Sequence, residues 1–572
     1  MAAERWMLQT KRADFQEMAK CHGISPVTAR IIRNRDVVGT ESVEKYLKGG
    51  LKDLYNPYLL KDMELTVSII REKVREEKRI RIVGDYDIDG VCSTYLLYRA
   101  LTEIGAYADY EIPDRIRDGY GINESIIRQA AEDGIDTILT CDNGIAATAQ
   151  IRLAKELGLT VLITDHHDIM KEEGVEILPP ADAIINPKQM ACHYPYPEIC
   201  GGLVAYKLVQ ALYEAYSISQ EKWLEMLEFA AIATVGDVMK LQDENRIIVK
   251  EGLKRMGQTK SLGLRKLIEK NNLDEDNITA YQIGFVIGPC LNAGGRLHTA
   301  KLALSLLLSE SEEEADRMAL ELKDLNDQRK TMTRQGTEEA VEQVEALYKD
   351  HKVLVVYLPS CHESLAGIIA GRLREQYQKP AFVLTDGEEG VKGSGRSIET
   401  YHMFDALVEV KELLSKFGGH PMAAGLSLKK ENVDEFRRLL NENAKLGEED
   451  FIKKIWIDVP MPLEYVNEPL IEELDLLEPF GQGNEKPLFA QKGLSIRSVR
   501  VMGKNRNVVK FSLASEKGMP MDGLLFADGD SFLHELSGCR KIDVIYYPAV
   551  NEYNGNKSLQ IVIKNYKIAK ES

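Results

Sequence analysis

The clearest pattern along the chain is an alternation of short apolar runs and helix-like segments between residues 79 and 187. Short runs rich in Val, Ile and Leu are typical of strands that are buried on both faces of a parallel sheet. The segments 93–105 and 146–158 between them have helical periodicity, as expected for helices that cross over between parallel strands. We therefore predict an α/β fold with a doubly wound parallel sheet. The predicted strands are residues 79–85, 136–141, 159–165 and 182–187.

After this α/β segment the pattern changes to one long charged helix. Ser311 and Glu314 have the spacing of a capping box, in which the first residue caps the helix and the later one bonds back to it. Apolar residues such as Ala315 and Leu322 then recur at helical spacing. We predict a connector helix over residues 309–348.

A second, smaller α/β unit follows the connector. Two apolar strand runs flank a helix-like segment, and two glycine-rich segments are expected to form loops. The small size of this unit indicates a lobe that closes on the first one. The strand runs are 352–358 and 381–386, the helix-like segment is 366–378, and the glycine-rich segments are 393–395 and 418–419.

After residue 450 short strand patterns separated by turn signals predominate, and few helical patterns remain. Many short strands at such spacing predict a small β-barrel. The expected domains are an N-terminal helical segment (1–50), a catalytic domain with the parallel sheet (51–308), the connector helix (309–348), the smaller α/β domain (349–450) and the barrel (451–572).

Composition narrows the class of protein. The chain has 572 residues, of which 44% are hydrophobic, and no apolar run reaches the ~18 residues of a membrane helix. The first residues lack the pattern of a secretory signal, so we expect a cytoplasmic protein. Eight cysteines without a CxxC motif are typical of reduced thiols.

The charge is uneven along the chain. A net charge of −17 opposes indiscriminate adhesion to nucleic acid or to acidic membranes. Residues 486–572 contain fourteen Lys and Arg against eight Asp and Glu, a local net charge of +6. Any contact with nucleic acid is therefore expected to be local.

The first candidate metal ligands follow the first predicted strand. Asp85, Asp87 and Asp89 lie in the segment GDYDIDG. Asp87 and Asp89 are two residues apart, so strand alternation would point both carboxylates the same way before a turn at Gly90. Paired carboxylates attract divalent cations, although a lone DxD motif is more often a solvated acidic loop.

Further candidate ligands follow the later strands. Asp142 ends the second run in TCDNG, and Asp165, His166 and His167 end the third in TDHHD. Asp237 is the single acid in the apolar pattern AAIATVGDVMKL, where a buried carboxylate is costly unless it is paired or bound to metal. Taken singly, these residues could be a turn residue, a surface histidine and a helix cap. Taken together they predict a metal site, and mixed carboxylate and imidazole ligands fit Mn²⁺ or Mg²⁺.

A pair of such ions is expected to support phosphoryl chemistry. Two ions about 3.5–4 Å apart can activate water and stabilise both oxygens of an in-line displacement. Hydrolysis of a phosphodiester or a phosphoanhydride is therefore the expected reaction. The sequence contains no Walker loop GxxxxGK[ST] that would indicate a nucleotide-driven motor.

Three motifs in order, GDYDIDG, TDHH and FGGH, resemble those of the DHH phosphoesterase superfamily, and the length and segment order resemble its RecJ exonucleases. The resemblance runs from about residue 50 to the end and implies 5′ to 3′ hydrolysis of single-stranded DNA in repair and recombination. The metal ligands it implies are Asp85, Asp87, Asp89, Asp142, His166, His167 and Asp237. Relatives often have histidine at the position of Val83, so Asp85 is expected to take over that role.

The resemblance also implies residues that bind the substrate. These are Asn292, Arg296, His362, Ser394, Arg396, Gly418, Gly419 and His420, and the implied catalytic residues are Asp142, His167, His420 and Arg396. Adjacent glycines let backbone N–H groups approach an anion, and arginine binds phosphate oxygens in a bidentate manner. A GG pair on its own is more often just a turn.

The C-terminal segment resembles the oligonucleotide-binding (OB) barrel of these exonucleases. Its local charge of +6 and its aromatic residues suit a groove that tracks a single strand and stacks bases. Aromatic residues in a barrel are more often core, so at most two of Phe511, Tyr546, Tyr547 and Tyr553 are assigned to stacking. The chain departs from the family pattern at Tyr553, where tryptophan is common, and around Asp237, where alanine and proline usually flank the acid.

Three functions remain to be compared. The first is a single-strand DNA exonuclease with two Mn²⁺ or Mg²⁺ ions, expected to be a monomer that binds single-stranded DNA and works beside a helicase and a single-strand-binding protein. The second is a DHH phosphodiesterase for short oligoribonucleotides or cyclic dinucleotides, and those relatives generally lack the barrel. The third is a binding protein with a degenerate site, which the complete set of predicted ligands disfavours.

Overall fold

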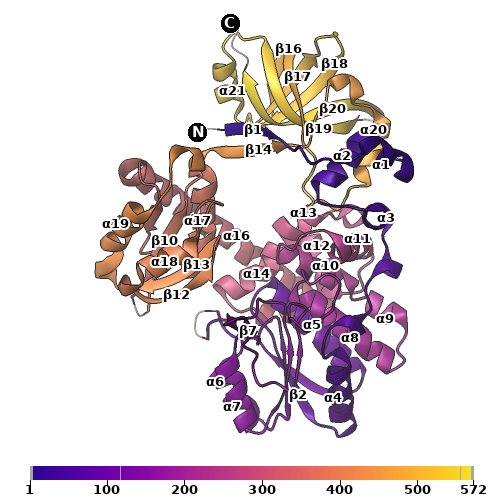
Figure 1. Ribbon diagram of the computed structural model, residues 1–572, viewed down its shortest axis with the longest axis vertical. Coiled ribbons are helices and arrows are strands. Elements are labelled where there is room, and N and C mark those ends of the chain that lie inside the picture. Colours follow the sequence, from indigo (N-terminus) through magenta and orange to yellow (C-terminus); the bar gives the residue numbers. More distant parts are fainter. Residues whose placement is uncertain (1–3, 116–117, 389, 554, 569–572) are drawn as a thin grey trace.

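The computed structural model describes residues 4–115, 118–388, 390–553 and 555–568, and it contains three lobes (Figure 1). We call them the parallel-sheet lobe (51–308), the mixed-sheet lobe (349–450) and the barrel (458–568). In Figure 1 the parallel-sheet lobe lies at the bottom, the mixed-sheet lobe on the left and the barrel at the top. Within the described ranges, no helix has both the length and the apolar character of a membrane span.

The parallel-sheet lobe is built on five parallel strands in the order β3-β2-β4-β5-β8, which confirms the predicted doubly wound sheet. The strand order reverses between β2 and β4, and ligands bind beyond the carboxyl ends of strands at such a point. The edge strand β3 was not predicted, because its sequence YADYE lacks an apolar run. The strands are β2 (Arg79–Val83), β3 (Tyr107–Glu111), β4 (Thr137–Cys141), β5 (Thr160–Thr164) and β8 (Ala183–Ile185).

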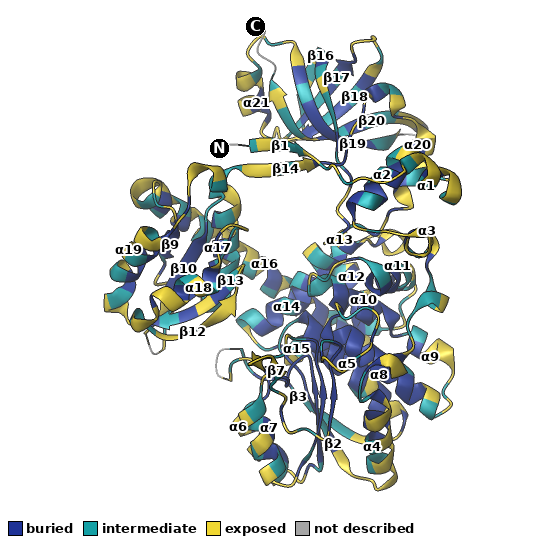
Figure 2. Ribbon diagram, in the orientation of Figure 1, coloured by how far each residue is buried: buried dark blue, intermediate teal, exposed yellow. Residues whose placement is uncertain are grey.

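Helices cover both faces of this sheet, and alternate strand residues enter two separate cores (Figure 2). Leu139 and Leu162 pack with α5, α8 and α10 in the largest core of the molecule. Ile138 and Val161 pack on the other face with α6 and α7. The helices are α5 (Ile88–Glu103), α6 (Glu124–Glu132), α7 (Thr148–Glu156), α8 (Gly201–Ala215) and α10 (Leu227–Gly236).

The connector is a single long helix, α16 (Glu312–Gln343), which continues into a π-helical turn at Val344–Tyr348. The Ser311 side chain caps it by accepting a hydrogen bond from the Glu314 N–H at 3.3 Å. The helix packs against α12 (Leu262–Lys270) and α14 (Gly288–Leu297) of the parallel-sheet lobe, and against α17 (Glu363–Tyr377) of the mixed-sheet lobe. One helix thus contacts both lobes.

The mixed-sheet lobe contains five strands in the order β12-β13-β11-β10-β9, of which only β9 and β10 are parallel neighbours. The expectation of glycine-rich loops was wrong, because 393–395 lies in β11 and 418–419 lies in β12. A Cβ at Gly395 would lie 2.4 Å from the Met403 sulfur, so glycine lets α18 (Met403–Glu409) pack closely on the strand. The strands are β9 (Leu354–Tyr357), β10 (Ala381–Gly387), β11 (Gly390–Arg396), β12 (Leu414–His420) and β13 (Ala423–Leu428).

The C-terminal strands close into a ring, because β16 pairs with both β17 and β19. Phe511, Tyr546 and Tyr547 are buried in the barrel core, as expected for most of its aromatic residues. The side chain of Tyr553 lies outside the described part of the structure. The strands are β15 (Val459–Pro460), β16 (Phe489–Met502), β17 (Val508–Ala514), β18 (Pro520–Phe526), β19 (Lys541–Tyr553) and β20 (Asn556–Ile568), with helices α20 (Glu468–Asp475) and α21 (Gly529–Leu536).

The N-terminal segment differs from the helical unit that the sequence predicted. It begins with a strand, β1 (Glu4–Leu8), which pairs in parallel with β14 (Lys453–Ile457), the strand that leads into the barrel (Figure 1). Ile32 of α2 (Pro26–Asn34) and Leu47 of α3 (Thr40–Lys48) share a core with the barrel strands. Helices α2 and α3 therefore pack against the barrel, and α3 also contacts α11 (Asp243–Met256) of the parallel-sheet lobe.

Candidate metal centre and active site

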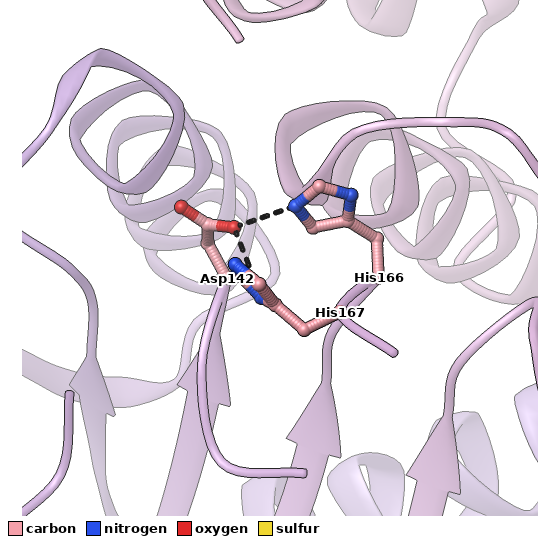
Figure 3. A group of neighbouring side chains, drawn as sticks. All are labelled: Asp142, His166 and His167. Carbon is pink, nitrogen blue, oxygen red and sulfur yellow. Dashed lines mark ion pairs between the residues drawn. The ribbon is translucent and has the colours of Figure 1, made fainter. Parts of the chain in front are cut away.

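Two candidate ligands occupy the point where the strand order reverses. Asp85 follows β2 and Asp142 follows β4, so both leave the carboxyl ends of neighbouring strands. Asp142 has a left-handed backbone with a φ of 60°, a conformation that Asp adopts more readily than most residues. Its N–H donates to the Thr164 carbonyl at 3.0 Å, and its carbonyl accepts from the Tyr120 hydroxyl at 2.8 Å. These bonds hold the Asp142 carboxylate in the site (Figure 3).

The first motif is arranged differently from the strand alternation that we expected. Asp87 is the N-cap of α5, and its carboxylate accepts from the N–H groups of Asp89 and Gly90 at 2.9 and 3.1 Å. Asp89 and Gly90 therefore lie in the first helical turn, and Gly90 does not begin a loop. A Cβ at Gly90 would lie 2.5 Å from the Asp85 carbonyl oxygen, so only glycine lets the helix approach the strand end this closely.

Asp89 is held by a second helix N-terminus. Its two carboxylate oxygens accept from the N–H groups of Gly201 and Gly202, each at 2.7 Å, at the start of α8. A Cβ at Gly201 would also lie 2.7 Å from Asp142. The sequence analysis missed this glycine pair, although a GG pair that opens an apolar helix is a visible signal for close approach to an anion.

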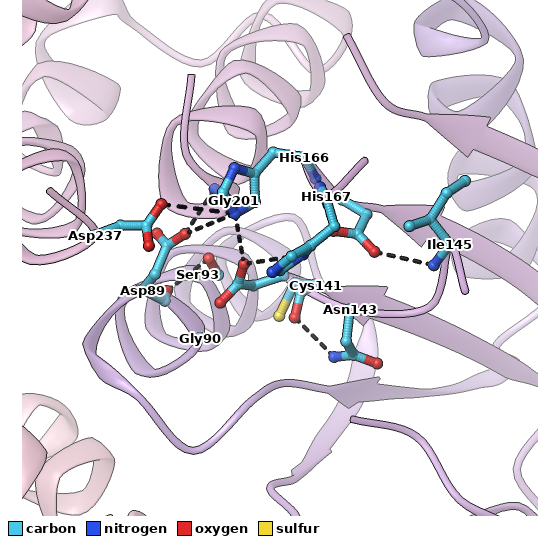
Figure 4. A network of polar contacts seen from close by, with 12 residues as sticks. Asp89, Gly90, Ser93, Cys141, Asn143, Ile145, His166, His167, Gly201 and Asp237 are labelled. Atoms are coloured by element: carbon cyan, nitrogen blue, oxygen red, sulfur yellow. Dashed lines mark hydrogen bonds and ion pairs between the residues drawn. The ribbon is translucent and has the colours of Figure 1, made fainter. Parts of the chain in front are cut away.

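The two histidines both approach the same carboxylate oxygen, Asp142 Oδ1 (Figure 3). His166 Nε2 lies 3.2 Å from Asp142, 3.6 Å from Asp89 and 3.7 Å from Asp237 (Figure 4). His167 Nδ1 lies 2.7 Å from Asp165 and 3.9 Å from Asp142. Asp165 thus orients His167, which suits a residue next to the ligands rather than among them.

Asp237 lies at the end of its helix and not inside it. It is the C-cap residue of α10, and its side chain is 29% exposed. The next residue, Val238, has a φ of 57°, which is rare for a β-branched side chain. Backbone strain of this kind clusters at functional sites, and here it adjoins a candidate ligand.

The cluster is electrostatically strained without a cation. Burial and the neighbouring Asp87 charge raise the pKa of Asp85 to about 8. Burial and the charges of Asp89 and Asp87 raise the pKa of Asp237 to about 8, and burial with the same neighbours raises that of Asp142 well above its usual value. Burial also lowers the pKa of His166, which favours the neutral imidazole that binds metal.

The donor atoms of this cluster fit a divalent metal. Both carboxylate oxygens of Asp85, one oxygen of Asp142 and Nδ1 of His166 are buried without a hydrogen-bond partner. Buried polar atoms are normally paired, so these atoms indicate a missing partner. Oxygen and imidazole donors suit Mn²⁺ or Mg²⁺. Ligand atoms within 4.8 Å of one another form three groups: Asp142, His166 and His167; Asp89, His166 and Asp237; and Asp85, Asp87 and Asp142.

A cluster of arginines lies beside these carboxylates. Arg296, on α14, donates to the Ser364 carbonyl of the mixed-sheet lobe at 2.8 Å. Burial and the charges of Arg115 and Arg329 lower the pKa of Arg296 to about 10, with a smaller lowering from Arg396. Like charges gathered beside an acidic site favour a polyanion between the lobes. Arg115 and Arg329 were missed, because isolated arginines carry no motif.

The remaining predicted residues are divided between the two lobes, which contact each other through α14 and α17. Asn292 shares α14 with Arg296, and His362 caps α17. Ser394 and Arg396 lie on β11, and Gly418, Gly419 and His420 end β12. The charge of His420 contributes to a lowered pKa of Asp168, after a larger contribution from the Lys188 hydrogen bond, so β12 faces the histidine motif. Among the described residues, no hydrogen bond or ion pair joins His420 or Arg396 to the seven candidate ligands.

An exposed aromatic pair was also missed. Tyr281 and Phe285 are stacked with ring centroids 4.6 Å apart and are 66% and 65% exposed. Phe285 lies in a π-helical turn, Ile283–Ile287, which runs directly into α14 and packs on the end of α10. Such turns often mark functional sites. Aromatic residues one turn apart are usually core, so their spacing does not predict that they lie on the surface.

Comparison with known proteins agrees with this site. Residues 79–234 match the DHH family N-terminal domain, 350–446 the DHHA1 domain and 457–565 the RecJ OB domain. The single-stranded-DNA-specific exonuclease RecJ of Bacillus subtilis is 38% identical over 99% of this chain and 71% of its own length. That of Escherichia coli is 33% identical over 98% of this chain and 99% of its own length.

Solved structures give the same result. The crystal structure of RecJ from Thermus thermophilus in complex with Mn²⁺ matches with a TM-score of 0.85 and 28% identity, covering all of this chain and 80% of that one. A second structure of the same protein, with Mg²⁺, has a TM-score of 0.79 and 26% identity, with coverage of 100% and 79%. The motifs, the three domains and their arrangement therefore agree, and the chain belongs to the family of RecJ single-stranded-DNA-specific exonucleases.

Proposed function

We propose that this chain is a metal-dependent exonuclease that hydrolyses the phosphodiester bonds of single-stranded DNA from the 5′ end, in DNA repair and recombination. The observation that carries the proposal is a cluster of seven acidic and histidine side chains, of which Asp85, Asp89, Asp142 and His166 are buried and three have unpartnered donor atoms, beside a cluster of arginines. A cluster of this kind has no structural advantage without cations, because buried like charges destabilise the fold.

The side chains divide into ligands and substrate contacts. Asp142 and His166 each belong to two of the three ligand groups, so we assign them to the boundary between two Mn²⁺ or Mg²⁺ ions. When bound, the ions supply activation of water and charge stabilisation at the phosphate. His167, oriented by Asp165 and by the Tyr120 hydroxyl at 3.1 Å, is placed to hold or move a proton at the reacting oxygen.

The second lobe completes the site. Arg396 and His420 belong to the mixed-sheet lobe, where the Arg396 guanidinium lies over Gly367 of α17 and donates to the Gly395 carbonyl at 2.8 Å. We assign both residues to the scissile phosphate when the lobes close. Arg115 and Arg296 of the parallel-sheet lobe add positive charge beside the candidate ligands. Asn292, His362, Ser394, Gly418 and Gly419 are assigned to the strand.

The barrel and the aromatic pair support a long single strand as substrate. A closed ring of strands with local positive charge can track a backbone, and Tyr281 with Phe285 offers an exposed stacking surface on the catalytic lobe. A phosphodiesterase for dinucleotides needs neither feature. We further propose a cytoplasmic monomer that receives single strands from a helicase and a single-strand-binding protein.

The polarity is tested with single strands labelled at one end. Release of labelled mononucleotide at the earliest times from a 5′-labelled strand, and only late release from a 3′-labelled strand, is the expected result. Early release from the 3′ label would contradict the proposed direction.

A further inference from the structure

One buried arginine joins three parts of the chain. Arg246, in α11 (Asp243–Met256) of the parallel-sheet lobe, is 2% exposed. Its guanidinium donates to the carbonyl oxygens of Leu476 and Leu477, which directly follow α20 of the barrel, at 2.9 and 2.8 Å. It also donates to the Tyr46 carbonyl of the N-terminal segment at 2.9 Å and lies 4.1 Å from the centre of the Tyr46 ring.

Leu241 and Gln242 add further contacts among the same three parts of the chain, and we call this region the junction. The Leu241 N–H donates to the Gln482 carbonyl at 2.7 Å. The Gln242 side chain donates to the carbonyls of Arg35 at 2.9 Å and Gly483 at 3.2 Å. Residues 241–246 of the parallel-sheet lobe therefore bond to residues 476–483 of the barrel. This segment of the parallel-sheet lobe begins four residues after the candidate ligand Asp237.

Within this junction, Arg246 and Gln242 each bond to both the N-terminal segment and the barrel. The Arg246 guanidinium donates to the carbonyl oxygens of Tyr46, Leu476 and Leu477, whereas the Gln242 amide donates to those of Arg35 and Gly483. Arg246 is the buried cation of the pair and makes the larger share of the bonds. Removing the guanidinium would leave the carbonyl oxygens of Tyr46 and Leu476 without this donor, whereas that of Leu477 would still accept from the Asn484 side chain at 2.8 Å. Loss of these bonds is expected to weaken the attachment of the barrel to the parallel-sheet lobe.

We propose that Arg246 is a positioning residue that fixes the barrel relative to the metal centre. The end of a DNA single strand bound to the barrel then reaches the metal centre. The inference rests on the proposed exonuclease function. A strand too short to reach the barrel does not need this alignment. A long strand does, because tethering raises the local concentration of its end only when the geometry is fixed.

The test compares Arg246→Met, which keeps the apolar stem and removes the donors, with Lys254→Met at an exposed position of the same helix. On long single strands we expect kcat/KM of Arg246→Met to fall about tenfold through lost effective concentration, while cleavage of very short oligonucleotides stays unchanged. Arg246→Lys, which restores a single cation, should recover part of the loss. Gln242→Ala is the milder second variant, should Arg246→Met fail to fold.

A structural readout separates positioning from general damage. Spin labels at Glu156 and Lys504, both exposed, report the distance between the parallel-sheet lobe and the barrel. A broader distance distribution in Arg246→Met, with unchanged Mn²⁺ binding, supports the proposal. Equal losses on long and short strands, weakened Mn²⁺ binding or an unchanged distribution would overturn it. Absence of all single-strand cleavage by the unmodified protein would instead contradict the exonuclease function itself.

Discussion

His166 Nε2 lies 3.2 Å from a carboxylate oxygen of Asp142, although the two residues leave the ends of different strands. Each of them belongs to two of the three groups of neighbouring ligand atoms, so the pair connects these three groups. This carboxylate oxygen, Asp142 Oδ1, is within ion-pair distance of His166 but accepts no hydrogen bond, and the lowered pKa of His166 favours the neutral imidazole that binds metal. Their closeness is the structural basis for a site with more than one ion.

The first prediction concerns Asp142. Asp142→Ala should lower Mn²⁺-dependent hydrolysis by more than about 100-fold, because it removes a carboxylate that is assigned to holding the ions that would activate water and stabilise charge at the phosphate. It should also raise the melting temperature of the metal-free protein, since a buried charge among like charges is lost. Glu156→Gln on exposed α7 is the matched control and should change neither. Substantial residual hydrolysis by Asp142→Ala would sink the assignment.

The second prediction concerns pH. Asp85 and Asp237 have a folded-state pKa of about 8, above the usual value for Asp, so the metal-free fold binds extra protons. Its stability is greatest below about pH 4 for these two groups and is lost as the pH rises toward 8. Mn²⁺ competes with these protons, so the rise in melting temperature on adding Mn²⁺ should be larger at pH 8 than at pH 6. Thermal unfolding at both pH values checks this, and an equal rise at both would contradict it.

The third prediction concerns lobe closure. His420 is exposed at the end of β12 and faces the other lobe, so His420→Ala should mainly lower kcat and leave strand affinity nearly unchanged. His402→Ala, a half-exposed histidine of the same lobe that caps α18, is the control. Single-turnover kinetics together with binding measurements separate the two effects. Weaker binding with unchanged turnover would show that His420 holds the strand instead.

The fourth prediction concerns the aromatic pair. Replacing Tyr281 and Phe285 with alanine should weaken binding of a long single strand by about 1–3 kcal/mol for each stacked base. Tyr107→Ala, an exposed tyrosine on the edge strand β3, serves as the control. Fluorescence anisotropy with labelled single strands measures the loss. Identical affinities of the double variant and the control for the single strand would show that the aromatic pair does not bind it.

Much of the fold could be predicted because buried parallel strands have a distinct apolar pattern. The edge strand β3 was missed because its sequence lacks that pattern. The glycine-rich strands β11 and β12 were mistaken for loops because the close approaches that require glycine are visible only in three dimensions: Gly395 of β11 packs against Met403, and Gly419 of β12 packs against Ala423 and Ala424 of β13. Likewise, no local signal shows that the N-terminal helices share a core with the barrel. Deleting residues 451–572 would therefore expose Ile32 and Leu47, and point substitutions are the cleaner test of the barrel.

The candidate site could be predicted where residues form motifs. The carboxylates and histidines that follow β2, β4 and β5 meet because parallel strands end at the same edge. The bonds from the N–H groups of Gly201 and Gly202 to Asp89, and the approach of Arg115, depend on contacts between distant segments. These contacts have no periodicity or spacing in the sequence.

The most direct test of the central claim is digestion of end-labelled single-stranded DNA, duplex DNA and RNA by the purified protein with Mn²⁺, with Mg²⁺ or with EDTA. The proposed function predicts stepwise shortening of single-stranded DNA with either metal, little digestion of blunt duplex DNA, and no digestion of any substrate in EDTA. Hydrolysis that persists in EDTA, or a preference for duplex DNA over single strands, would contradict it.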